Sequence, residues 1–154
     1  MRSLLPSLLA RLRADTRGMS LIETAVVIPA AAMLVAGMSD VAMGFSARLK
    51  IQQAASRSAE LATAAGVNGS ALSVLQSEAA SAAGVSAGQV IVDKWLECAG
   101  VRQASFDGNC LSGQQVARFV SITIAGSYQP RFPLMQSLSG PTMPLEGYSA
   151  VRVQ

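Results

Sequence analysis

The sequence predicts an α+β protein: a long N-terminal helix, membrane-spanning in its first part, then a short helix and a small antiparallel β-sheet. No charged residue lies between Thr24 and Ser39, and the preceding Met19–Ile22 extends this apolar stretch to the about 20 residues that cross a bilayer. Residues 48–65 are rich in Ala, Gln, Arg and Leu, which favour a helix. After Gly84, β-branched and aromatic residues become frequent, as is typical of strands.

Three segments are predicted along the chain, with the long helix in the middle. Residues 1–18 form a basic leader, residues 19–65 the long helix and residues 66–154 an α+β domain. Gly66–Gly69 would end the long helix, because Gly and Asn tolerate the left-handed conformation of a helix C-cap. A second helix is expected over Ser70–Ala83, with Ser70 as its possible N-cap.

Three strands are expected in the C-terminal domain. Gln89–Cys98 is β-branched and aromatic, Val116–Tyr128 alternates between apolar and polar residues, and Leu145–Val153 alternates less regularly. Gln129–Pro144 holds four of the six prolines and is predicted to be a loop.

The charge of the chain is concentrated at its front. Hydrophobic residues make up 51% and charged residues 14% of the chain, whereas about 25% of a soluble chain is charged. The formal charge of +3 equals that of the first eighteen residues, which contain four arginines and one acidic residue, Asp15. The positive-inside rule places this leader in the cytoplasm and the residues after Asp40 outside it. The remainder is neutral and offers no basic stripe for nucleic acid.

Catalytic and metal-binding residue patterns are missing from the sequence. There is no histidine and only two cysteines, whereas a structural zinc site needs four ligands, and no nucleophile motif is present. No enzyme activity, cofactor, metal or small-molecule substrate is therefore expected. Cys98 and Cys110 are expected to form a disulfide that closes a loop in an oxidising compartment. A redox role is the weaker alternative, because Cys-x-x-Cys spacing is absent.

Glu23 is the unusual residue of the apolar stretch. A charge at the centre of a span costs about 2.5–3.5 kcal/mol, so Glu23 needs a partner unless it sits at the headgroup boundary. If the chain is cut after Gly18, Met19 carries a free amine with a pKa of about 7.7–8.0. Met19 and Glu23 are spaced i, i+4 and share a helix face. The amine and the carboxylate could pair within one chain or between neighbours, and thereby set the axial register of an assembly.

Two further features of the helix concern packing. Pro29 lies too deep for a first-turn proline, so we expect it to remove a hydrogen bond and kink the helix. Gly37 and Gly44 nearly share a face, and small residues let membrane helices approach closely. An ordinary membrane-helix proline and ordinary small helix residues remain the alternatives.

Gly18 followed by Glu23 resembles the class III signal cut by prepilin peptidases. Residues 17–62, RGMSLIETAVVIPAAAMLVAGMSDVAMGFSARLKIQQAASRSAELA, resemble the TadE-like pseudopilins, minor pilins of the tight-adherence (Tad/Flp) pilus system. The matching features are a glycine, an early glutamate, an apolar run into a proline, and an Ala/Arg-rich helix end: Gly18, Glu23, Ala25–Ile28, Pro29 and Ala54–Ala65. Asp40 stands where the family often has a late glutamate.

The resemblance implies a pilin-like, membrane-anchored structural subunit of a tight-adherence type IV pilus, which serves adhesion, surface attachment and biofilm formation. Its implied partners are a prepilin peptidase acting at Gly18 and Met19, other pilin subunits with the assembly machinery, and inner-membrane lipid. It implies a single-pass protein of the bacterial inner membrane with a cytoplasmic N-terminus, later part of the periplasm or a cell-surface pilus. The alternatives are a signal-anchored periplasmic binding module that does not polymerise, and a type II secretion-like pseudopilin.

Overall fold

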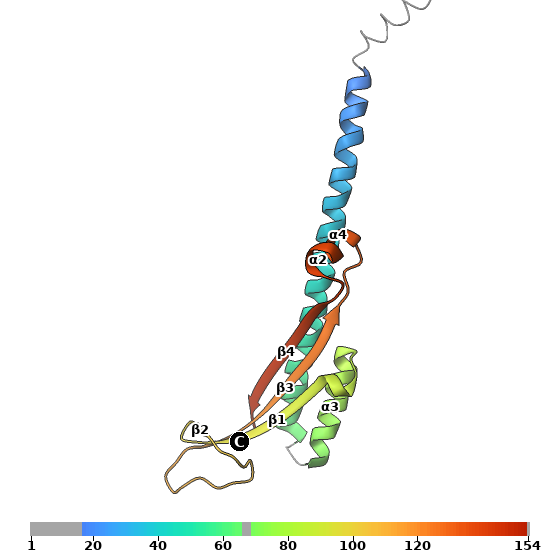
Figure 1. The fold of residues 1–154 in the computed structure, drawn as a ribbon. Helices are drawn as coiled ribbons and strands as arrows, with labels where there is room; N and C mark the ends of the chain where they lie inside the picture. Colours follow the sequence, from blue (N-terminus) through green and yellow to red (C-terminus); the bar gives the residue numbers. More distant parts are fainter. Residues whose placement is uncertain (1–16, 66–68, 154) are drawn as a thin grey trace, which may run out of the picture. The chain divides into compact units, whose positions relative to one another are not determined.

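The computed structural model describes residues 17–65 and 69–153 (Figure 1). The predicted leader lies outside the described residues up to position 16, and so do residues 66–68, where the long helix was expected to end. The chain forms two compact units, Met1–Ser39 and Asp40–Gln154. The elements in order are α2 (Arg17–Ala65), α3 (Gly69–Ala83), the 3-10 helix η1 (Ala87–Gln89), β1 (Val90–Cys98), β2 (Val101–Arg102), β3 (Val116–Tyr128), α4 (Pro133–Ser139) and β4 (Met143–Arg152).

The α+β prediction is confirmed: a long apolar helix and a short helix are followed by a four-stranded sheet. The strand β3 has the predicted bounds, whereas β1 begins one residue late. Gln89 belongs instead to η1, where its side-chain carbonyl accepts a hydrogen bond from the Ser86 N–H at 3.1 Å. Ser70 lies inside α3, so its prediction as an N-cap is wrong.

The predicted loop Gln129–Pro144 is wrong in part. Its middle forms α4, and its last two residues already belong to β4. The prolines suggested a loop, but Pro133 occupies the first turn of α4, where a missing N–H costs nothing. Pro144 lies on an edge strand, the position in a sheet that tolerates proline.

The sheet is antiparallel, with the strand order β2-β1-β3-β4. The long strand β3 lies at its centre and pairs with β1 along nine residues and with β4 along ten. The register pairs Val92 with Ile122 and Ile122 with Ser149. This register places alternate apolar residues of the strands on one face, which must be covered.

Small side chains of α2 and α3 cover that face. Alanines form most of the helix surface in the core, so the backbones of the helices come close to the strands. The buried cluster consists of Ile51, Ala54, Ala55 and Ala59 of α2, Ala79, Ala80 and Ala83 of α3, and Val90, Ile122 and Ile124 of the sheet. The C-terminal part of α2 is thus a core helix of the second unit.

Glutamines from the two helices bind backbone groups of β4 and β1, the two strands that flank β3. The Gln52 side chain of α2 donates to the Tyr148 carbonyl oxygen at 2.7 Å and accepts from the Tyr148 N–H at 3.2 Å. The Gln76 side chain of α3 donates to the Val90 carbonyl oxygen at 2.9 Å. Such contacts occupy backbone groups that would otherwise be open to another strand.

Candidate functional site

The first part of α2 presents apolar side chains to its surroundings. Only 6% of the most apolar 18-residue stretch of this helix is buried. Among the described residues, Ile22–Ala64 is the one helical segment long and apolar enough to cross a membrane. The large exposed apolar residues of the first unit are Ile22, Val26, Val27, Ile28, Met33, Leu34, Val35 and Met38. A helix whose surface is apolar on all sides and exposed needs lipid or other helices around it.

The predicted processing and assembly residues all lie on this helix. Gly18, Met19, Glu23 and Pro29 are in α2. Glu23 is exposed, and it takes part in no ion pair among the residues that the structure describes. The helix thus places an exposed carboxylate one turn beyond Met19, in its apolar first part.

Asp40 begins the second unit and is almost completely buried, with 1% of its surface exposed. Its carboxylate accepts a hydrogen bond from the Tyr128 hydroxyl at 2.5 Å. It also accepts from the backbone N–H groups of Arg131 at 3.0 Å and Phe132 at 3.2 Å. A buried carboxylate is tolerated when hydrogen bonds replace its hydration, and these three donors tie the end of β3 and the start of α4 to α2.

The contact with Asp40 changes the pKa of Tyr128. The hydrogen bond to Asp40 raises the pKa of the Tyr128 hydroxyl above its ordinary value of 10.0, and burial and the negative charge of Asp40 act in the same direction. The Tyr128 ring also packs against Gly44, with ring carbons 3.3 Å from the position of a Cβ atom. Gly44 therefore serves packing within the chain.

The Asp40–Tyr128 contact was missed in the sequence. The available signals were the single acidic residue directly after the apolar stretch and the Tyr-x-Pro turn at Tyr128–Pro130. The two residues are 88 positions apart, and only the sheet and helix packing brings them together. The helix α4, which follows this turn, was missed as well.

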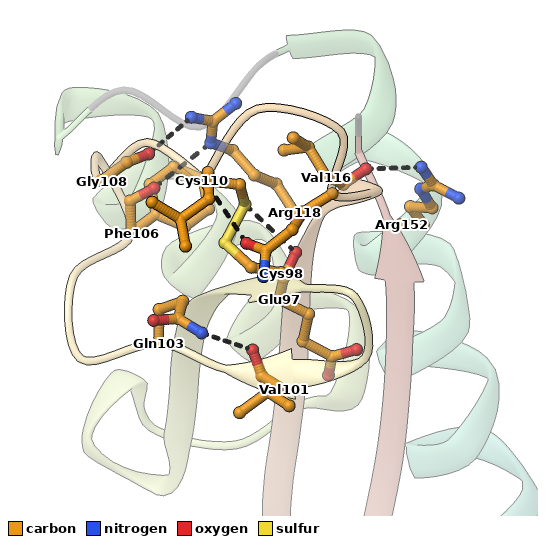
Figure 2. Close-up of a disulfide and its surroundings, with 12 residues drawn as sticks. Glu97, Cys98, Val101, Gln103, Phe106, Gly108, Cys110, Val116, Arg118 and Arg152 are labelled. Carbon is orange, nitrogen blue, oxygen red and sulfur yellow. Dashed lines mark hydrogen bonds between the residues drawn. A yellow bond between two sulfur atoms is a disulfide. The ribbon is translucent and has the colours of Figure 1, made fainter.

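At the other end of the sheet, Cys98 and Cys110 lie at disulfide distance, with their Cα atoms 5.5 Å apart (Figure 2). Arg118 of β3 reaches over the loop between them and donates to the carbonyl oxygens of Phe106 and Gly108, each at 3.2 Å. The Lys94 ammonium lies 4.5 Å from the centre of the Phe106 ring. The loop is therefore fixed by a cross-link and by cations of the neighbouring strands.

These features define a class of protein: an α+β domain carried by a long helix whose first part is apolar and suggests membrane anchoring. Residues 18–60 match the model of the family described as TadE-like protein. The resemblance is thereby confirmed for the N-terminal part of the chain. The TadE-like family is a structural one, and the match suggests a protein related to the Tad pilus. No curated protein and no solved structure gives a significant match to the chain.

Proposed function

We propose that this chain is a minor pilin, or pseudopilin, of a tight-adherence pilus. It is made as a precursor, cut by a prepilin peptidase between Gly18 and Met19, and held in the inner membrane by the first part of α2. It then joins other pilin subunits in a filament that serves adhesion and surface attachment. One observation carries the proposal: the first part of the stretch that matches the TadE-like family is an exposed apolar helix, and it contains the exposed Glu23.

The chemistry of the cut explains the position of Glu23. Cleavage after Gly18 would leave a protonated amine on Met19, one helical turn from the Glu23 carboxylate. In the low dielectric of a helix bundle, a lone carboxylate is costly and a matched amine removes much of that cost. Pairing between subunits would then favour one axial stagger, and the TadE-like helix would act as the assembly element.

The proposal is tested by the mass and N-terminal sequence of the full chain extracted from membranes of cells that contain the pilus system. We expect a mature chain that begins at Met19, and a full-length precursor when Gly18→Leu blocks the cut. A mature chain that begins at Met1, or after Ala42, would instead indicate a signal-anchored module that does not polymerise.

Assembly is tested separately with Glu23→Ala. Cleavage should persist, while incorporation into sheared surface filaments should fall strongly, because the Met19 amine loses its partner. The matched control is Glu60→Ala, which removes an exposed carboxylate further along the same helix and should leave incorporation unchanged. Normal incorporation of the Glu23 variant would refute the pairing, and retention in the filaments of a type II secretion system would favour that class of pseudopilin.

A further inference from the structure

The short helix α4 carries apolar side chains that the second unit leaves uncovered. Leu138 is 75% exposed and Leu134 56% exposed, and their i, i+4 spacing puts them on one face of the helix. Phe132, directly before α4, is also partly exposed. Apolar residues grouped on one side of a short surface helix need a partner, whereas single exposed ones do not.

Asp40 of α2 fixes the chain directly before α4. Its carboxylate binds the N–H groups of Arg131 and Phe132, and it directly follows Ser39, the last residue of the uncharged run. At 1.5 Å per residue, a helix over Met19–Ser39 is about 31 Å long, which matches the about 30 Å of a hydrocarbon core. If this stretch spans the bilayer, Asp40 and the residues that it binds lie at the level of the headgroups.

The residues of α2 that follow Asp40 also carry exposed apolar side chains. Val41 and Phe45 are exposed and line an apolar hollow of about 260 Å³ together with Met135 of α4. Arg48 lines this hollow too, and Arg131 lies beside α4 and is exposed. Apolar side chains rimmed by arginines suit the boundary between acyl chains and phosphate headgroups.

We propose that Val41, Phe45, Phe132, Leu134 and Leu138 form an interfacial patch that rests in the headgroup region of a phospholipid bilayer. The patch is a membrane contact in addition to the span, and Asp40 is the positioning residue that binds the chain before α4 to α2. The inference rests on the proposed anchoring of α2 in the membrane. Lipid is favoured over a protein partner because Asp40 directly follows the last residue of the uncharged run, and because the arginines near these apolar residues suit phosphate headgroups.

The experiment uses tryptophan reporters in the full chain, reconstituted into vesicles of phosphatidylcholine and phosphatidylglycerol with and without brominated phosphatidylcholine as quencher. Trp95→Phe removes the single native tryptophan and keeps a ring stacked on Phe119. The patch reporter is Leu138→Trp. Its matched control is Leu111→Trp, directly after Cys110, because Leu111 is 76% exposed. Val35→Trp reports the span itself.

We expect brominated lipid to quench the Val35→Trp and Leu138→Trp emission severalfold more than the Leu111→Trp emission. Quenching of the Val35→Trp emission without that of Leu138→Trp would refute the patch and leave the anchor intact. If the Val35→Trp emission is not quenched either, the anchoring fails and the patch with it. The Leu138→Trp emission could instead change with the protein density in the vesicles and show no quenching by brominated lipid. That result would assign the surface to a second copy of the chain and overturn the proposal. If Trp95→Phe lowers the melting temperature, the same substitutions are made in the chain that keeps Trp95. The emission of the native chain is then subtracted from that of each variant.

Discussion

At the scale of single residues, Tyr128 and Asp40 form the central contact of the second unit. Among the described residues, three donors bind the carboxylate of Asp40, and it takes part in no ion pair. Two of these donors are backbone N–H groups, so the contact fixes the chain path after β3 as well as the side chain of Tyr128. Replacing Asp40 by Ala would leave the N–H groups of Arg131 and Phe132 without their acceptor, and would leave the Tyr128 hydroxyl only the main-chain carbonyl oxygen of residue 40, at 3.3 Å. An unpaired buried donor is the costly way to lose a hydrogen bond.

The raised pKa of Tyr128 gives a pH prediction. A Tyr148→Phe variant leaves Tyr128 as the one tyrosine of the chain, so tyrosinate absorbance reports it alone. We expect ionisation above the ordinary value of 10.0, and ionisation at lower pH when Asp40→Asn removes the neighbouring charge. Because folding raises this pKa, the stability that Tyr128 contributes is complete below about pH 10 and is lost as the pH rises through the raised pKa. An identical titration curve in both variants would contradict the contact.

At the scale of elements, the approach of α2 to the sheet depends on two glycines. A Cβ atom on Gly147 of β4 would lie 2.7 Å from the Ile51 Cγ2 atom and 2.8 Å from the Ile51 carbonyl oxygen. A Cβ atom on Gly126 of β3 would meet the Ile51 Cδ1 atom at 2.5 Å. The first clash involves the helix backbone, which cannot move aside, whereas the second involves the tip of a flexible side chain.

This difference predicts an order of stability. Gly147→Ala should destabilise the fold by about 1–3 kcal/mol through overpacking, and Gly126→Ala should cost less because Ile51 can change rotamer. Gly88→Ala is the control, since a Cβ atom there meets nothing within 4 Å. Thermal unfolding of the detergent-extracted chain, followed by circular dichroism, gives the comparison. Equal melting temperatures for the Gly147 and Gly88 variants would show that α2 does not pack as described.

At the scale of the whole molecule, the chain combines a bare apolar segment with a cross-linked domain. The apolar segment suggests a membrane, and the cysteine pair implies an oxidising compartment for the domain that contains it. The proposed orientation, with the leader in the cytoplasm, agrees with both requirements. The side of the membrane that the domain faces is therefore the property to measure.

We expect the domain to be reached from outside the cytoplasm. In spheroplasts, a membrane-impermeant maleimide should label Ser112→Cys, an exposed position two residues after Cys110, without lysis. Cys98 and Cys110 should stay unlabelled until a reductant is added. Cys98→Ser with Cys110→Ser should cost about 2–3 kcal/mol of stability, the usual worth of a bridge that closes a loop of this size. Labelling of Ser112→Cys only after lysis, or free native thiols, would contradict this orientation.

Much of the fold could be predicted because local sequence decides it. The long uncharged run, the Ala-rich helix and the alternation of Val116–Tyr128 each depend on residues close together in the chain, and each element appeared with nearly the expected bounds. The helix α4 could not be predicted in this way. Its prolines are compatible with both a loop and a first helical turn, and the hydrogen bonds from Arg131 and Phe132 to Asp40 fix the backbone before it.

The sequence by itself determined the candidate anchor, the TadE-like stretch with Gly18 and Glu23, and the α+β class, because these follow from composition and spacing over neighbouring residues. Only the tertiary structure decided that Asp40 meets Tyr128, that Gly147 lies beneath Ile51, and that α4 stands beside Val41 and Phe45. These contacts join residues that are distant in the chain. Their formation depends on the strand register and on the close packing of alanine-faced helices, and neither can be read from a local pattern.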